Sequence, residues 1–379
     1  MASPILQTVP LGFQWPTVDP FLFCVHHDDA YPPGDGRFGP AAALTGRNIG
    51  SDFEGRDGWR MYHGTMVPGF PQHPHRGFET VTYARQGFID HSDSMGAAAR
   101  FGSGDVQWMT AGRGVVHSEM FPLISETSPN PVELFQIWLN LPAADKMVEP
   151  HFTMLWDENI PRVDSSADDI PGEGTAIKAA GTGAGTGTAI KAAGTGARIT
   201  VIAGSLGGVT APPPPPHSWA NRADSDLAIW HVHLDAGGSW RMPPARNSDT
   251  VRVVYVFGGP LDGPAMAFDS EDVAVDTGVV VRSDAAVTLS SPAGAEALVL
   301  QGRPIGEPVS QHGPFVMNTS EEIEQAFSDY RRTGFGGWPW PVDDPVHGAD
   351  PSRFARHASG RMERPASIGA PPAAVAESC

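Results

Sequence analysis

Short β-type segments separated by glycines fill residues 78–119, and they constrain the fold of this chain more than any other feature. Segments such as Thr80-Val81-Thr82-Tyr83 and Val115-Val116-His117 are rich in the β-branched and aromatic residues that favour strands. Glycines recur around them at positions 77, 87, 96, 102, 104, 112 and 114. This rhythm is typical of short strands joined by tight turns. It predicts an antiparallel β-sandwich or β-barrel.

The length of 379 residues predicts two such units, because single hydrophobic cores rarely keep growing beyond about 250–300 residues. Further strands are expected at 132–141, 199–203, 227–234, 250–257, 278–281 and 297–301. Between the two groups of strands, residues 175–184 recur unchanged at 188–197, as expected of a flexible Gly/Thr/Ala linker. We therefore predict an N-terminal barrel at 1–160, a flexible linker at 161–198 and a C-terminal barrel with a helix at 199–335.

The helix is predicted from its capping residues and its apolar face. Thr319 and Glu322 form a capping-box pair, and the apolar residues that follow, Ile323, Phe327 and Tyr330, fall on one face. Beyond residue 336 the chain is rich in Pro, Gly, Ala and Arg without periodicity. We expect an extended or disordered tail at 336–379. The expected fold class is all-β with one C-terminal helix.

Composition and charge exclude several classes of protein. The formal net charge of −18 argues against direct binding to nucleic acid or to an anionic membrane surface. No stretch approaches eighteen consecutive apolar residues, so no membrane-spanning helix is predicted. The first sixteen residues lack the basic segment and apolar run of a secretory signal. We expect a cytoplasmic protein.

Two pairs of polar residues carry the chemistry that the sequence suggests. His73-Pro74-His75 and His117-Ser118-Glu119 each place two side chains on the same face of an extended strand. Pro74 cannot donate to a sheet ladder, so His73 is expected at a strand edge or entry. Three imidazoles and a carboxylate suit Fe(II), Mn(II), Ni(II), Cu(II) or Zn(II) rather than calcium. Histidine pairs on strands are also often surface or hydrogen-bonded core residues, and the pattern alone leaves both interpretations open.

Longer motifs favour the metal site. The run HPHRGFETVTY at 73–83, the run GDVQWMTAGRG at 104–114 and the following His117-Ser118-Glu119 closely resemble the signature of the pirin family, within the cupin superfamily. The resemblance implies a bicupin, with two antiparallel β-barrels of the jelly-roll type and a metal only in the N-terminal one. It also implies that the ligands are His73, His75, His117 and Glu119, and that iron is the metal.

The same resemblance implies two functions. Several family members resemble quercetinases, so the leading expectation is a dioxygenase that cleaves quercetin or a related flavonol with O2. In such a reaction Glu119 could additionally act as general base if it loosens from the metal. Other members act as protein-binding regulators, so the alternative is a non-catalytic, metal-dependent regulatory protein that acts through a protein partner. Three parts of the chain depart from the family pattern: residues 24–71, the duplicated linker and the segment after residue 336. They weaken any transfer of substrate preference.

Other polar residues are also candidate ligands. Glu79 lies four residues after His75, where many cupins place their metal carboxylate, but we expect Glu119 to take that role. His231 and His233 form another i, i+2 pair in the second barrel, and no His-x-Glu partner follows them, so no second metal site is expected. The adjacent His26 and His27 are expected in a loop, because neighbouring residues face opposite sides of a strand.

Overall fold

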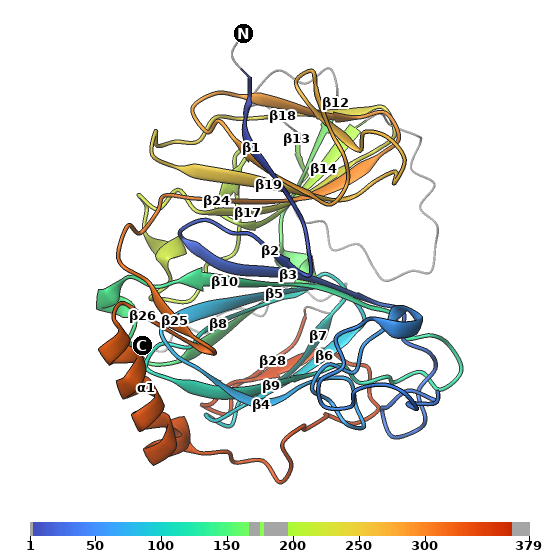
Figure 1. Ribbon diagram of the computed structural model, residues 1–379, viewed down its shortest axis with the longest axis vertical. Helices are drawn as coiled ribbons and strands as arrows, with labels where there is room; N and C mark the ends of the chain where they lie inside the picture. The colour runs from blue at the N-terminus through green and yellow to red at the C-terminus, as the bar shows by residue number, and fades with distance from the viewer. Residues whose placement is uncertain (1–2, 167–174, 178–195, 366–379) are drawn as a thin grey trace, which may run out of the picture.

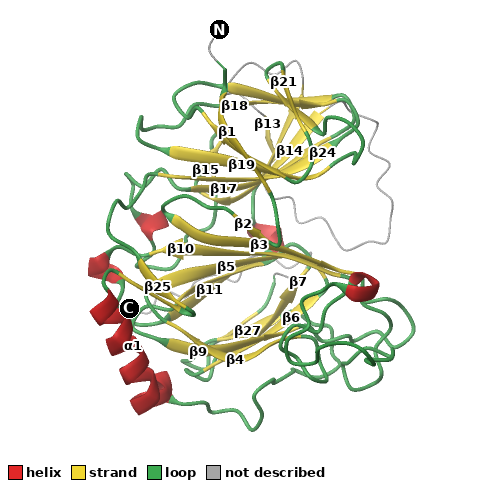
Figure 2. Cartoon of the chain, viewed as in Figure 1, coloured by secondary structure: helices red, strands yellow, loops and turns green. Residues whose placement is uncertain are grey.

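Two β-barrels stacked on one another form the molecule (Figure 1). The computed structural model describes residues 3–166, 175–177 and 196–365. Strands dominate these residues (Figure 2), and their one α-helix, α1 (Ser320–Thr333), lies in the C-terminal part of the chain. The all-β prediction with a C-terminal helix is thereby confirmed. In the described part of the chain, no helix is long and apolar enough to cross a bilayer.

The N-terminal barrel consists of two antiparallel six-stranded sheets that face each other. The first sheet has the order β11 (His151–Leu155), β8 (Val106–Thr110), β5 (Phe78–Gln86), β10 (Val132–Asn140), β3 (Phe21–Asp29) and β2 (Gln14–Trp15). The second has the order β28 (Met362–Glu363), β27 (Phe354–Arg356), β7 (Ala98–Gly102), β6 (Phe88–Asp93), β9 (Val115–Met120) and β4 (Gly69–His75). The strand β4 is an edge strand, as Pro74 predicts.

The C-terminal barrel has a larger and a smaller antiparallel sheet. The eight-stranded sheet has the order β1 (Ile5–Pro10), β22 (Thr277–Val281), β19 (Val251–Gly258), β24 (Ala295–Gly302), β17 (Ala228–Leu234), β14 (Gly196–Ala203), β12 (Arg162–Ser166) and β13 (Thr175–Ile177). The four-stranded sheet has the order β18 (Gly238–Met242), β23 (Val287–Ser291), β20 (Met266–Phe268) and β21 (Glu271–Val273). All six strands expected beyond residue 130 are present.

Short elements complete the chain. Two hairpins join β15 (Ser205–Leu206) to β16 (Val209–Thr210) and β25 (Ser310–His312) to β26 (Phe315–Met317). The 3-10 turns are η1 (Arg56–Gly58), η2 (Ala143–Asp145), η3 (Asp157–Asn159), η4 (Trp219–Asn221) and η5 (Gly334–Gly336). Helix α1 begins with the predicted capping box of Thr319 and Glu322, and Gly334 ends it in the left-handed conformation.

One sheet of the N-terminal barrel is buried on both faces. In β10, Leu134, Gln136 and Trp138 face the inside of their own barrel, while Phe135 and Ile137 face the second barrel. The outward residues of this sheet share an apolar core with the large C-terminal sheet, where Trp15 stacks on Tyr255 at 5.1 Å between ring centroids. Because strand alternation uses both faces, the sheet that bounds the first barrel also joins it to the second.

Two strands differ from the predicted division of the chain. The strand β1, expected in the N-terminal barrel, pairs with β22 of the C-terminal barrel. The strand β12, expected in the flexible linker, pairs with β14. The linker prediction for residues 178–195 falls outside the described residues. A strand joins whichever sheet offers an unpaired edge, and sequence alone does not show which edge is free.

The segment that was predicted as an extended or disordered tail packs on the N-terminal barrel as far as residue 365. Its strand β27 pairs with β7. Arg100 on β7 is fully buried; it donates to both carboxylate oxygens of Asp90, at 2.7 and 2.6 Å, and to the carbonyl oxygen of Asp350. The backbone N–H of His347 donates to Asp90 at 2.7 Å. The buried ion pair of Arg100 and Asp90 therefore holds this C-terminal segment on the barrel. The composition of the segment did not predict this packing.

This fastening predicts a large effect of removing one charge. Arg100→Met should lower the free energy of unfolding by about 3–5 kcal/mol, because Asp90 would remain buried and unpaired. Arg100→Met combined with Asp90→Leu should recover part of the loss. Urea unfolding followed by fluorescence measures both. Arg331→Met, at an exposed helix position, is the control and should change the value by less than about 0.5 kcal/mol. If Arg100→Met and Arg331→Met lowered the free energy of unfolding equally, this role of the ion pair would be contradicted.

Candidate metal centre

The pairing of β4 with β9 brings three of the four predicted ligands together. In the antiparallel register His73 lies opposite His117, and Phe70 lies opposite Glu119, with a bulge between Phe70 and His73. Because residues two apart share a face, His75 follows His73 on the same side and Glu119 follows His117. Segments about forty residues apart in the sequence thus meet inside the first barrel.

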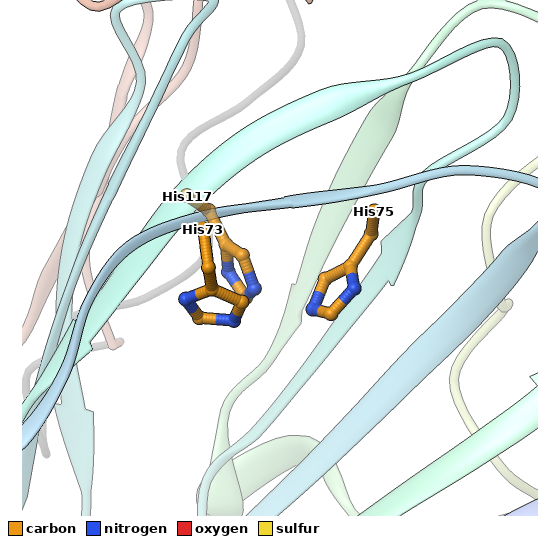
Figure 3. A group of neighbouring side chains, drawn as sticks. All are labelled: His73, His75 and His117. Atoms are coloured by element: carbon orange, nitrogen blue, oxygen red, sulfur yellow. The ribbon is translucent and has the colours of Figure 1, made fainter. Parts of the chain in front are cut away.

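The three imidazoles form a compact group. One ring nitrogen of each of His73, His75 and His117 lies within 4.8 Å of those of the other two. Ring centroids are 4.5 Å apart for His73 and His117, 4.8 Å for His73 and His75, and 4.9 Å for His75 and His117. Figure 3 shows their nitrogens directed into one space. This arrangement allows one ion to contact all three side chains.

The hydrogen bonding of these ring nitrogens fits a metal ion. Nδ1 of His75 and both nitrogens of His117 are buried and have no hydrogen-bond partner among the described residues. Such atoms are rare in folded proteins unless water or an ion satisfies them. Nδ1 of His73 lies 2.9 Å from the carbonyl oxygen of Pro71, which can only accept, so its Nε2 keeps a free lone pair. The donor set therefore suits a borderline divalent metal.

Burial keeps the three rings neutral. It lowers the pKa of His73 to about 4 and holds the pKa values of His75 and His117 well below their ordinary value. Desolvation is the largest cause in each case, and neighbouring histidines add to it for His75 and His117. Neutral imidazole is the form that binds a metal, so near pH 7 no proton needs to leave before an ion enters.

Glu119 lines the same cavity but is held by neutral donors. Its carboxylate accepts hydrogen bonds from Thr82 Oγ1 at 3.0 Å and from Gln136 Nε2 at 3.1 Å. Burial raises the pKa of Glu119, and His91, directly opposite on β6, opposes the rise. The compact histidine group does not include this carboxylate. Its role as a fourth ligand stays a prediction.

Glu79 points away from this group. Its carboxylate accepts hydrogen bonds from Thr110 Oγ1 at 2.6 Å and from Ser218 Oγ at 2.5 Å, and Ser218 belongs to the segment that precedes η4. Burial raises the pKa of Glu79 to about 7. The residue therefore ties the two halves of the chain together through a buried hydrogen-bond cluster.

The two histidines of the second barrel, His231 and His233, contact the carboxylate of Glu296. His231 Nε2 lies 2.7 Å from Glu296 Oε2, and His233 Nδ1 lies 3.8 Å from the other oxygen of the same side chain. Arg85 of the first barrel reaches Glu296 at 2.6 Å. These histidines belong to an ion-pair network between the barrels.

The loop prediction for His26 and His27 is wrong. Both residues lie on β3 and face opposite sides. Nε2 of His26 contacts Glu133 at 3.0 Å, whereas His27 lines the cavity of the three histidines. The alternation of Phe23, Val25 and His27 in the sequence carried this signal, because these three inward positions share strand parity.

His73 and His75 line a cavity of about 580 Å³. Its walls are largely aromatic: Phe13, Phe23, Phe53, Phe70, Phe121 and Trp138. Phe53 comes from residues 24–71, one of the three parts of the chain that were expected to depart from the family pattern. A larger cavity, of about 930 Å³, lies against the C-terminal barrel and has no histidine among its described lining residues. Of these two cavities, as lined by the described residues, the smaller one combines candidate metal ligands with an apolar, ligand-sized space.

The turn after His75 is fixed from three sides. Buried Lys146 Nζ donates to the carbonyl oxygens of Gly77 and Val316 and to Asn140 Oδ1, at 2.8, 3.1 and 2.7 Å. Burial lowers the pKa of Lys146 to about 8. A Cβ at Gly77 would lie 2.0 Å from the Val316 oxygen, so only glycine fits at this point. The turn therefore holds the end of β4, and His75 with it.

Comparison with known proteins agrees with this geometry. Residues 12–139 match the family model Pirin, and residues 229–336 match the model for the pirin C-terminal cupin domain. A Pseudomonas aeruginosa protein named "Putative quercetin 2,3-dioxygenase" is 35% identical over 267 residues, which are 70% of this chain and 79% of that protein. Human pirin is 32% identical over 279 residues, which are 73% of this chain and 80% of that protein.

A solved structure is also similar. The crystal structure of quercetin 2,3-dioxygenase from Acinetobacter baumannii superposes with a TM-score of 0.61 at 25% sequence identity, covering 88% of this chain and 98% of that one. The family models and the relatives extend over both barrels. The chain belongs to the pirin family of cupin proteins.

Proposed function

We propose that this protein is a metal-dependent dioxygenase that cleaves quercetin or a related flavonol with O2. One observation carries the proposal: the imidazoles of His73, His75 and His117 form one compact group beside a cavity with aromatic walls, and His75 and His117 have buried nitrogens without a hydrogen-bond partner among the described residues. The names of the Pseudomonas and Acinetobacter relatives support the choice of reaction.

His73, His75 and His117 would hold the metal, with Glu119 as the fourth ligand. We propose iron, because imidazole and carboxylate ligands suit Fe(II) and dioxygen chemistry needs a redox-active ion. When bound, the ion would supply Lewis acidity toward a substrate hydroxyl and electron transfer to O2. The protein's part is to fix the ligands and to exclude water.

If it loosened from the metal, Glu119 would accept the proton of the substrate hydroxyl. Burial, which raises the pKa of this carboxyl in the metal-free protein, would favour proton uptake by the released side chain. Thr82 and Gln136 keep it oriented through their hydrogen bonds. The aromatic walls would hold a flat ring system by stacking and edge contacts.

Removing one imidazole should abolish tight metal binding. His117→Ala should weaken Fe(II) affinity by more than about 100-fold, the upper end of the loss for residues that only hydrogen-bond a metal ligand. Competition with a coloured chelator under anaerobic conditions measures the affinity. His217→Ala changes an exposed histidine of the second half and should bind as the wild type does. Unchanged affinity in His117→Ala would place the ion elsewhere.

Replacing the proposed base should slow turnover. Glu119→Gln should lower kcat for quercetin-dependent O2 uptake by about 10²–10⁴-fold, the usual contribution of a general base. The metal content of each preparation is measured alongside, so that loss of the ion is separated from loss of the base. Glu324→Gln, at an exposed helix position, serves as control. If the metal-loaded Glu119→Gln protein turned over normally, Glu119 would not be the base.

A further inference from the structure

A chain of hydrogen bonds lies behind one wall of the histidine cavity. His27 Nδ1 lies 2.7 Å from the hydroxyl oxygen of Tyr62, which donates to Asp29 Oδ2 at 2.5 Å. Arg60 Nη1 donates to the other oxygen of Asp29 at 3.0 Å. His27, Tyr62 and Asp29 are all buried. Metal binding as proposed above uses none of these four residues.

The order of partners fixes which nitrogen of His27 carries the proton. Asp29 is paired with Arg60 and acts as an acceptor, so the Tyr62 hydrogen is directed to it. The Tyr62 oxygen must then accept from the Nδ1–H of His27. In a neutral imidazole the second nitrogen is an acceptor. Nε2 of His27 therefore presents a lone pair, and it has no partner among the described residues.

Tyr62 is held in place at a conformational cost. Its φ of 56° lies in the left-handed region, which bulky residues rarely adopt. Backbone hydrogen bonds in both directions between Tyr62 and Asp52, at 2.9 and 3.0 Å, keep it there. Strained residues of this kind often mark functional sites. Residues 30–66 thus deliver a hydroxyl group to His27.

Two further acceptors lie around the same cavity. Nε2 of Gln72 donates to Asp343 Oδ1 at 2.7 Å, and a carboxylate oxygen can only accept, so Gln72 Oε1 remains available. Nδ1 of His63 lies 2.8 Å from the Gly50 carbonyl oxygen, which leaves Nε2 as an acceptor in the neutral ring. Among the described residues that line the cavity there is no lysine or arginine. The ring N–H of His27 and that of His63 are engaged by the protein, and one of the two amide N–H groups of Gln72 is engaged by Asp343.

We propose that His27, Gln72 and His63 select aromatic ligands that carry free hydroxyl groups over their methyl ethers. His27, the most buried of the three, would accept a hydrogen bond from a ligand hydroxyl through Nε2. Tyr62 is a positioning residue, because it acts only by fixing the protonation of His27. The inference rests on the proposed function for the aromatic nature of the ligand and for the place where it binds.

The test compares binding of quercetin with binding of its single methyl ethers at hydroxyls other than the 3-hydroxyl. Full-length protein is loaded with redox-inactive Zn(II) under argon, so that no turnover occurs, and tryptophan fluorescence measures each Kd. In the wild type at least one ether should bind about tenfold more weakly, as expected for the loss of one buried hydrogen bond. In His27→Phe the penalty for that ether should fall below about threefold.

Two further variants complete the test. Tyr62→Phe should also reduce the penalty, because the His27 proton is then free to move to Nε2, and a general loss of stability would not change this ratio. His217→Phe is the matched control and should keep the full penalty. An equal penalty in the wild type and His27→Phe, or no penalty in the wild type, would overturn the assignment.

Turnover is measured separately, so that the two proposals can fail independently. Methyl-ether discrimination without O2 uptake by the Fe(II)-loaded protein would contradict the dioxygenase function and leave the acceptor role of His27 in place. O2 uptake without methyl-ether discrimination would support the dioxygenase function and contradict the acceptor role of His27. If quercetin did not bind at all, both proposals would fail.

Discussion

The antiparallel pairing of β4 with β9 is the interaction on which the candidate metal centre depends. It sets His73 opposite His117, and strand alternation then turns His75 and Glu119 to the same side. A shift of one residue would turn these side chains to the other face of the sheet. The register is protected at the turn after β4, where Lys146 and the crowded Gly77 leave little freedom. The centre is thus a product of strand register.

Segments distant in sequence complete the cavity around this pair of strands. Residues 30–66 contribute Phe53 and the Tyr62 hydroxyl, and the segment after η5 contributes Asp343, which orients Gln72. Arg100 fastens that segment to the barrel through buried hydrogen bonds. These are the parts in which the chain departs from the family pattern. They shape the space around the three clustered histidines.

Local patterns predicted much of the fold. The strands beyond residue 130, the capping box at Thr319 and the edge position of β4 all follow from alternation, capping chemistry and proline geometry. The contacts that depend on long-range pairing were not predicted. The strand β1 pairs with a distant sheet, the segment after residue 336 packs through Arg100, and His27 lies on a strand. Whether a charged group or an imidazole is buried depends on residues far away in the sequence, and local patterns do not identify those residues.

Oxygen consumption by anaerobically purified protein tests the central claim most directly. The Fe(II)-loaded and metal-free forms are compared with quercetin under the same conditions. The account predicts multiple turnovers with iron and none without it, because the His73, His75 and His117 centre is proposed to be where the ion acts. No quercetin-dependent uptake by protein with bound iron would contradict the dioxygenase assignment and favour a regulatory role for the metal.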